Sequence, residues 1–203
     1  FGMPSQPDPT GDHSLLEWAR AYAGCEIHLL HRLDRPTGGL VLVAMTASAA
    51  AHLSRQFQER SVAKSYLAVV EGDCPSEAFE LLHHVGKLSG KNFVRAYDKP
   101  VRGSKLARMR ATVAARAEGL TLLRVELFTG RRHQIRAQLQ RLKLTIVGDH
   151  KYGKSSREPG FPGIALWSHT LGFTESDGRR TELRAVPPNV TPWDLFREIE
   201  ESP

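Results

Sequence analysis

The sequence predicts an α+β fold built around a mainly antiparallel sheet. Segments with strand patterns outnumber segments with helical periodicity, and several of the expected strands are neighbours joined by short turns. The clearest pair covers residues 108–117 and 120–128, with Glu118-Gly119 as the turn. A chain of 203 residues with 40% hydrophobic residues can bury a substantial core, and no linker divides it. We therefore expect a single domain over residues 1–203.

The helices are expected from polar capping residues that precede an apolar periodicity. Asp12 or Ser14 can cap a first helix that Gly24 ends, and Thr46 can cap a second helix that reaches residue 59. The other two expected helices cover residues 131–142 and start at Pro192. In the helix over 131–142, the apolar face holds Ile135 and Leu139, which places Arg136 on another face.

The remaining strands are expected from short apolar or alternating runs. Leu40 to Met45 follows Gly38-Gly39 and is almost continuously apolar, which is typical of a buried strand. The other expected strands cover residues 27–30, 62–71, 163–173 and 180–186.

Composition restricts the class of protein and of partner. The net charge of +6 and the isoelectric point near 9.6 favour a polyanionic partner. Cys25 and Cys74 are too few for a disulfide framework and have no metal-ligand spacing, so we interpret them as reduced packing residues. No apolar run approaches the ~20 residues of a membrane helix, and residues 1–12 lack a signal-peptide pattern. We expect a cytoplasmic protein without a membrane segment.

The segment from His31 to Ala44 organises the candidate chemistry. A charged turn that contains Pro36 carries one carboxylate, Asp34, between Arg32 and Arg35. Nearby guanidinium groups keep a carboxylate ionised, which suits a nucleophile. The local residues leave a second interpretation open, in which Asp34 only forms the turn and the arginines are solvated.

Five segments occur in a fixed order along the chain. They are His31-Arg32-Leu33-Asp34 followed by Thr37 and Gly39-Leu40, then residues 64–72, 130–136, 148–153 and 164–173. Together they resemble the RluA family of pseudouridine synthases from residue 2 to about residue 173. The resemblance implies a long mixed sheet with helices packed on it and a central RNA-binding cleft. It also implies an isomerase that converts uridine to pseudouridine in tRNA or ribosomal RNA.

The resemblance assigns roles to individual residues. Asp34 is the catalytic carboxylate, Arg131 is the basic residue opposite it, and Tyr66 can stack on uracil and take part in removal of the C5 proton. Ile164 and Leu166 line the base pocket. The expected RNA contacts are Arg32, Arg35, Lys64, Arg132, His133, Gln134 and Arg136. Trp167 and Gly38 depart from the common family pattern, which affects the shape of the cleft and not the proposed chemistry.

The expected partner is RNA, and we expect a monomer that uses no cofactor and no metal ion. Residues 75–105 show weak periodicity and many basic side chains, so they form either an exposed hairpin-like excursion or an arm against RNA phosphates. His83-His84 in this segment lacks a third ligand at useful spacing. The first residues look like the tail of a longer motif, so we expect natural N-terminal residues to be missing.

Two other functions stay open from the sequence. The first is a non-catalytic RNA-binding relative that keeps the fold, although Asp34, Tyr66 and Arg131 are all present. The second is a glycosidase, which also reacts at C1 of a sugar but needs a second carboxylic acid. Asp149 is the candidate for that acid.

Overall fold

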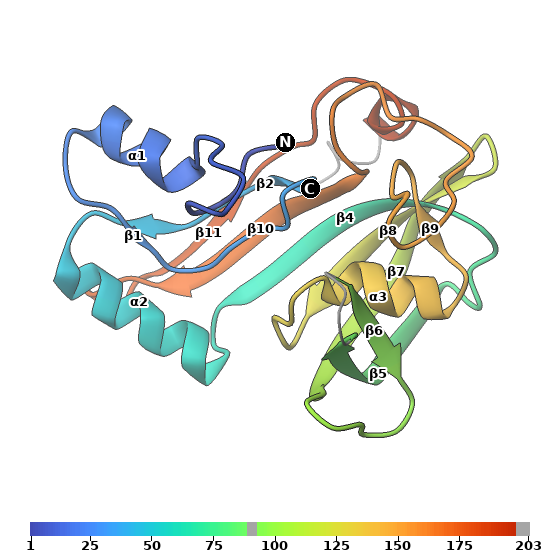
Figure 1. Cartoon of the computed structure of the whole chain (residues 1–203), viewed down its shortest axis with the longest axis horizontal. Helices are drawn as coiled ribbons and strands as arrows, with labels where there is room; N and C mark the ends of the chain where they lie inside the picture. The colour runs from blue at the N-terminus through green and yellow to red at the C-terminus, as the bar shows by residue number, and fades with distance from the viewer. Residues whose placement is uncertain (89–92, 198–203) are drawn as a thin grey trace.

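The computed structural model describes residues 1–88 and 93–197 (Figure 1). Within these residues, nine strands form one sheet whose main path is β11-β10-β4-β8-β7-β5-β6, while β2 pairs with β10 and β9 pairs with β4. The strands are β2 (Gly38–Gly39), β4 (Ala63–Glu71), β5 (Ala78–Lys87), β6 (Val94–Tyr97), β7 (Lys105–Ala117), β8 (Leu120–Leu127), β9 (Thr145–Ile146), β10 (Leu166–Thr174) and β11 (Arg180–Arg184). Every pairing is antiparallel except β2 with β10, which confirms the predicted fold class.

The helices begin where the capping residues predict. In α1 (Leu15–Ala23), Ser14 and Glu17 form a reciprocal capping box, and Gly24 ends the helix in the left-handed conformation. In α2 (Ala47–Glu59), the Thr46 side chain accepts the Ala49 N–H. The second helix lies against β10 and the small sheet of β1 (His28–Leu29) and β3 (Val43–Ala44), and α1 lies on the other side of this small sheet (Figure 1).

The core is centred on β4, which lies between β10 and β8. Residues 67–70 of β4 are at most 1% exposed, because strands pair on both edges and side chains cover both faces. The third helix, α3 (Gln134–Arg141), lies across the sheet close to β9 and β6 (Figure 1). Its buried Leu139 belongs to the same cluster as the β4 side chains. This packing brings the start of α3 to the middle of the sheet.

The predicted strand over 40–45 is wrong. Only β3 forms there, and it pairs for two residues with β1. The neighbouring backbone has other partners, since Leu40 N–H donates to Ser168 O and Leu42 N–H donates to His31 Nε2. The apolar run therefore fills space between elements without forming a continuous ladder.

The described residues of the segment 75–105 form strands of the main sheet and not an exposed hairpin outside it. Strand β5 pairs with β7 over eight residues, from Ala78 to Val85, and β6 closes the edge of the sheet by pairing with β5. Leu81, Val85 and Val94 are buried, so the hairpin contributes to the core. Lys91, one of the basic residues of this segment, lies outside the described residues, and so does Gly90.

Two expected helices differ from the structure. α3 begins at Gln134 because His133 adopts a left-handed φ of 49°, which ends helical geometry on its N-terminal side. At the expected helix that starts at Pro192, the described residues form a 3₁₀ turn, η1 (Trp193–Phe196), whose Trp193 and Phe196 are buried, and residues 198–203 lie outside the described part of the chain. Among the helices of residues 1–88 and 93–197, none has the length and apolar character needed to cross a bilayer.

Candidate active site

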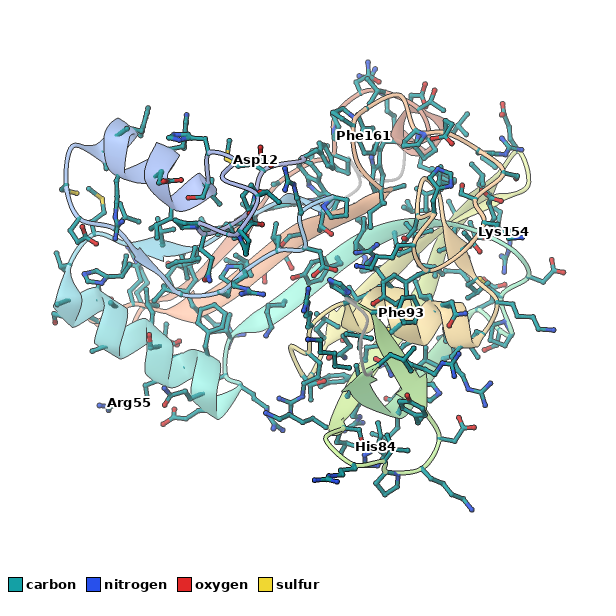
Figure 2. The ribbon with its side chains drawn as sticks, viewed as in Figure 1. Asp12, Arg55, His84, Phe93, Lys154 and Phe161 are labelled. Carbon is teal, nitrogen blue, oxygen red and sulfur yellow. The ribbon has the colours of Figure 1, made fainter. Side chains whose placement is uncertain are left out.

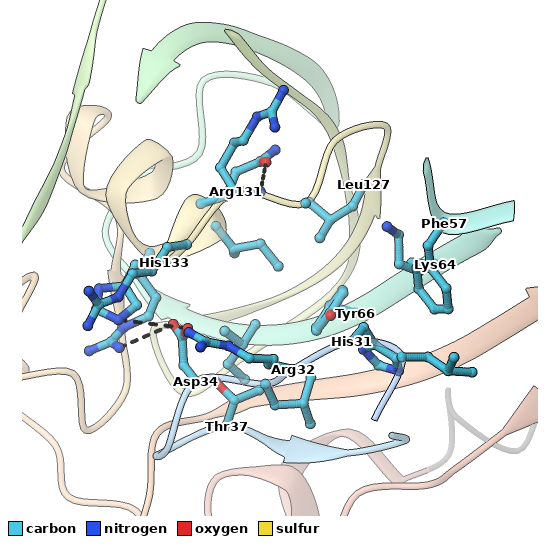
Figure 3. Close-up of a pocket in the computed structure, with 18 of the residues that line it drawn as sticks. His31, Arg32, Asp34, Thr37, Phe57, Lys64, Tyr66, Leu127, Arg131 and His133 are labelled. Atoms are coloured by element: carbon cyan, nitrogen blue, oxygen red, sulfur yellow. Dashed lines mark hydrogen bonds and ion pairs between the residues drawn. The ribbon is translucent and has the colours of Figure 1, made fainter. Parts of the chain in front are cut away.

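A cavity of about 580 Å³ opens between β4, the loop after β1, the end of α2 and the segment that leads into α3 (Figure 3). Asp34, Tyr66, Leu166 and Arg131 line it, so the fold brings together four residues that the sequence assigns to one site. These residues come from parts of the chain about 30 to 130 positions apart, and only the tertiary fold unites them.

Asp34 is held on a turn that the surrounding backbone closes. The Thr37 N–H donates to Asp34 O at 2.8 Å, next to Pro36. The Ser5 hydroxyl and the Leu33 backbone are joined by two hydrogen bonds of 3.2 Å, which attach the turn to the N-terminal segment. The Asp34 side chain is 20% exposed and faces the cavity.

Two side chains face the Asp34 carboxylate. Arg136 Nη1 lies 3.3 Å from Oδ2, and His133 Nε2 lies 3.8 Å from Oδ1. Arg136 also makes a bidentate pair with Asp149, at 2.7 Å from Nε and 2.8 Å from Nη2. Burial opposes the charge of Arg136, but its two carboxylate partners outweigh burial and raise its pKa. One buried guanidinium therefore holds both carboxylates.

The structure places Arg131 away from the Asp34 carboxylate, contrary to the expectation from sequence. Its Nε donates to Leu106 O at 3.0 Å, and its guanidinium points away from Asp34 (Figure 3). The late start of α3 explains the difference. Arg131 lies in the turn before the helix, whereas Arg136 lies in the first helical turn and faces inward.

Gln134 and Arg136 were expected to contact RNA, and the structure buries both at 3% and 4% exposure. Gln134 Oε1 accepts from the Thr129 hydroxyl at 2.8 Å and from the Arg131 N–H at 3.0 Å. Its amide nitrogen donates to Arg108 O at 3.1 Å. Gln134 therefore ties the start of α3 to β7 and to the end of β8. Both Gln134 and Arg136 line the cavity from buried positions, so RNA contact at these two residues stays a prediction.

Tyr66 lies on β4 and is 7% exposed. Burial raises the pKa of its phenol to about 12, and the negative charge of Asp34 acts in the same direction. The hydroxyl therefore stays protonated at neutral pH. Its backbone is in register with Ser168 of β10, which fixes the ring at the cavity wall.

The two predicted pocket residues lie on different sides of Asp34. Leu166 lines the cavity that Tyr66 lines, whereas Ile164 lines a second hollow of about 880 Å³. Asp34 borders both hollows. Ile135 of α3 also lines the first cavity, and its place inside the segment 130–136 was the available sequence signal for it.

The remaining predicted RNA contacts lie around the cavity mouth. Arg32 and Arg132 are exposed and line both hollows. Lys64 Nζ lies 5.6 Å from the Phe57 ring centroid, and burial lowers its pKa. Arg35 pairs with Asp12 and donates to Gly2 O at 2.7 Å, so it is tied to the N-terminal segment.

Two polar residues near the site, buried Asp149 and half-buried His31, were not among the site residues predicted for the synthase. Asp149 is 1% exposed and is held by Arg136 and by the backbone N–H groups of Lys151 and Tyr152. His31 accepts the Leu42 N–H at 2.9 Å, and burial lowers its pKa to about 4. Within the described part of the chain, no group of three His, Cys, Asp or Glu side chains could hold a metal ion.

Comparison with known proteins gives one family. The family model described as RNA pseudouridylate synthase matches residues 2–141. An uncharacterised RNA pseudouridine synthase of Synechocystis is 34% identical over 81% of this chain and 60% of its own length. Ribosomal large subunit pseudouridine synthase C of Rickettsia typhi is 31% identical over 82% of this chain and 55% of its own.

A further relative carries the same kind of name, and a solved structure shares the fold. Ribosomal large subunit pseudouridine synthase D of Nitrosomonas europaea is 36% identical over 64% of this chain and 37% of its own length. The chain thus spans about half the length of the curated relatives it matches. The solved structure of human RNA pseudouridylate synthase domain containing 1 superposes with a TM-score of 0.73 at 22% identity, covering 94% of this chain and 86% of that chain.

Proposed function

This chain belongs to the RluA family of RNA pseudouridine synthases, and from that premise we propose that it isomerises uridine to pseudouridine in RNA. The observation that carries the proposal is the carboxylate of Asp34, which borders a cavity, pairs with buried Arg136 and lies on the same cavity as Tyr66. The proposed substrate is tRNA or ribosomal RNA.

The reaction breaks the N1–C1′ bond of a uridine, rotates the uracil and joins C5 to C1′. The proton that leaves C5 is balanced by the proton that N1 gains, so the change is an isomerisation without net oxidation. Asp34 serves as the nucleophile or base, and Arg136 holds its carboxylate in place through the contact of 3.3 Å with Oδ2. The uridine has to leave its stack to reach Asp34, at a cost of a few kcal/mol that is least in loops and bulges.

A small basic hollow beside the cavity supports an RNA partner. It measures about 170 Å³ and has buried Val85 and Val94 in its floor. None of the described residues that line it is acidic, and four of them are cationic: Lys87, Lys105, Arg131 and Arg132. We call these four the basic rim. Cations in such an arrangement suit backbone phosphates on the strand that carries the target uridine.

The alternative functions are less well supported by this site. A glycosidase needs a second carboxylic acid that can be protonated and can reach the sugar. Asp149 is instead enclosed by a bidentate guanidinium and two backbone N–H groups. A non-catalytic relative would have no need for the paired Asp34.

The test uses the chain with structured and unstructured RNA that carries tritium at C5 of uridine. The proposed activity releases tritium to water and leaves pseudouridine in an intact RNA, with the same rate when a chelator is added to the unstructured RNA. Free uracil and an abasic site would identify a glycosidase. Binding without tritium release would identify the non-catalytic relative. We also propose a cytoplasmic monomer, and sedimentation with and without RNA tests its oligomeric state.

A further inference from the structure

Tyr152 contacts both side chains that face Asp34. It lies in the loop after β9 and is 5% exposed. Its hydroxyl lies 2.7 Å from His133 Nδ1, and its ring centroid lies 4.7 Å from the Arg136 Cζ. His133 faces Asp34 Oδ1 and Arg136 faces Oδ2, so a single tyrosine supports the neighbours of both oxygens.

The direction of the hydrogen bonds follows from their donors. The Val94 N–H donates to the Tyr152 oxygen at 2.9 Å, because a backbone N–H can only donate. If His133 Nδ1 also donated to this oxygen, the phenol proton would be buried with no acceptor among the described residues. Tyr152 O–H therefore donates to Nδ1, which leaves the proton of neutral His133 on Nε2.

The other end of the imidazole favours the same tautomer. Nε2 faces the Asp34 carboxylate, which attracts an N–H and repels a lone pair. Burial lowers the pKa of His133 to about 4, and Arg136, Lys151 and Arg132 act in the same direction although Asp34 opposes them. His133 is therefore neutral at pH 7. At 3.8 Å its N–H approaches Asp34 Oδ1 without a formed hydrogen bond.

Tyr152 is itself held from the β5–β6 hairpin. The Phe93 ring stacks on it with centroids 4.4 Å apart and an interplanar angle of 18°. Figure 2 places Phe93 next to α3, at the start of β6. The stacking holds the ring, the Val94 N–H holds its hydroxyl, and the bond of 3.1 Å from the Tyr152 backbone N–H to Asp149 Oδ1 holds the backbone below it.

We propose that Tyr152 is a positioning residue for the catalytic carboxylate: its hydroxyl holds His133 in the Nε2–H tautomer that faces Asp34, and its ring supports Arg136. The inference rests on the proposed function. In the RNA complex the His133 N–H closes on Oδ1 and makes the hydrogen bond that is incomplete without substrate. Asp34 is then held at both oxygens when it reacts.

Tyr152→Phe tests the hydroxyl because the ring keeps its contacts with Phe93 and Arg136. We expect the single-turnover rate at saturating RNA to fall about 10- to 100-fold, with the RNA Kd within about threefold of the parent. Tyr97→Phe is the matched control, since Tyr97 lies on β6, the strand that carries Val94, and its hydroxyl is not part of this arrangement. A parent rate in Tyr152→Phe would overturn the role of the hydroxyl.

Two substitutions at His133 separate its nitrogen atoms. Gln places an N–H where Nε2 lies and faces Asp34, whereas Asn reaches only the Nδ1 position. Asn tolerates the left-handed backbone of His133 better than Gln does, so backbone strain predicts the opposite order of activities. We expect His133→Gln to retain at least about tenfold more turnover than His133→Asn. The reverse order would contradict the proposal.

Nitrogen NMR of histidine-labelled protein provides a readout that does not depend on activity. We expect the His133 signal, identified by its loss in His133→Gln, to show a neutral Nε2–H ring in the parent. In Tyr152→Phe we expect a smaller share of this tautomer, because Asp34 alone then favours it. An Nδ1–H ring in the parent would overturn the inference. If the parent shows the Nε2–H tautomer but releases no tritium from RNA, the proposed function fails while this structural assignment stands.

Discussion

Two groups of basic side chains meet at this site, and they differ in burial and in partners. Arg136 and His133 are at most 9% exposed and have fixed neighbours in Asp34, Asp149 and Tyr152. In the basic rim, Lys87, Lys105 and Arg132 are exposed around the small hollow that they line. Desolvating a charge is costly unless its partners are held in good geometry, so the buried group gives orientation. The exposed group gives attraction to a polyanion.

Because of this difference, we expect catalytic rate and RNA affinity to respond to different substitutions. Substitutions in the buried group should change the rate at saturating RNA and leave the Kd almost unaltered. Substitutions in the basic rim should do the reverse. If both groups changed the rate and the Kd together, they would act as one.

The largest effect is expected at Arg136. Arg136→Lys keeps the charge but cannot bind Asp34 and Asp149 together through a planar fork, so the single-turnover rate should fall about 10²- to 10³-fold. Arg131→Lys is the matched control, because Arg131 donates to Leu106 O and faces away from Asp34. It should change the rate less than about threefold. Thermal unfolding of both variants checks that the fold is intact. If Arg131→Lys lost turnover and Arg136→Lys did not, Arg131 and not Arg136 would be the basic partner of the catalytic carboxylate.

Tyr66→Phe should have the next largest effect. The ring remains for stacking, whereas the hydroxyl is lost, so the rate should fall about 10²-fold with near-normal RNA binding. Because the phenol is protonated at neutral pH, it can assist C5 proton removal only by passing its own proton on. Tritium release from C5 should become limiting, with a larger isotope effect than in the parent. Turnover at the parent rate would make the ring a stacking platform only.

The basic rim should control the salt dependence of binding. Lys87→Ala and Lys105→Ala should each lower the slope of log Kd against log salt by about 0.7, with turnover at saturating RNA unchanged. Arg55→Ala is a suitable comparison, since Arg55 is exposed on α2 and lies outside the hollow that the rim lines. An unchanged slope and Kd in both rim variants would leave Lys87 of β5 and Lys105 of β7 without a role in RNA binding.

The smallest effect concerns stability and pH. His31 and His133 have pKa values lowered to about 4, so the unfolded chain binds protons first as the pH falls below about 6.5. Stability is therefore present above that pH and is lost toward pH 4. Between pH 7 and pH 5 each histidine should cost about 1–2 kcal/mol of unfolding free energy. In denaturant melts, the unfolding free energy of His31→Gln should fall less between pH 7 and pH 5 than that of the parent. The matched control is His13→Gln, since the His13 side chain is 67% exposed, and its unfolding free energy should fall as in the parent. Equal slopes would refute the assignment.

Local signals in the sequence predicted much of the fold. Ser14 and Thr46 cap helices as expected, and β4 matches its apolar run, because capping and period-two patterns act within a few residues. The run from Leu40 to Met45 misled because its hydrogen bonds go to His31 and Ser168, which are distant in the chain.

The site shows the same division between local and long-range causes. The motifs located Asp34 and Tyr66 at one cavity, but periodicity alone could not show which arginine faces the carboxylate. That choice depends on the left-handed backbone of His133 and on the bonds of Gln134 to β7 and β8. Tyr152 lies in a loop without periodicity, so its burial could not be expected from local pattern, and its place in the segment 148–153 was the available signal.

The most direct test of the account is a single-turnover measurement on Asp34→Asn with a confirmed RNA substrate. The amide is nearly isosteric with the carboxylate but is a poor nucleophile and base. We predict that the variant binds the RNA within about threefold of the parent Kd, because the rim is intact, and forms no pseudouridine above the background without enzyme. Measurable pseudouridine formation by the purified variant would contradict the role of Asp34 and, with it, the assignment of the chemistry to the buried group.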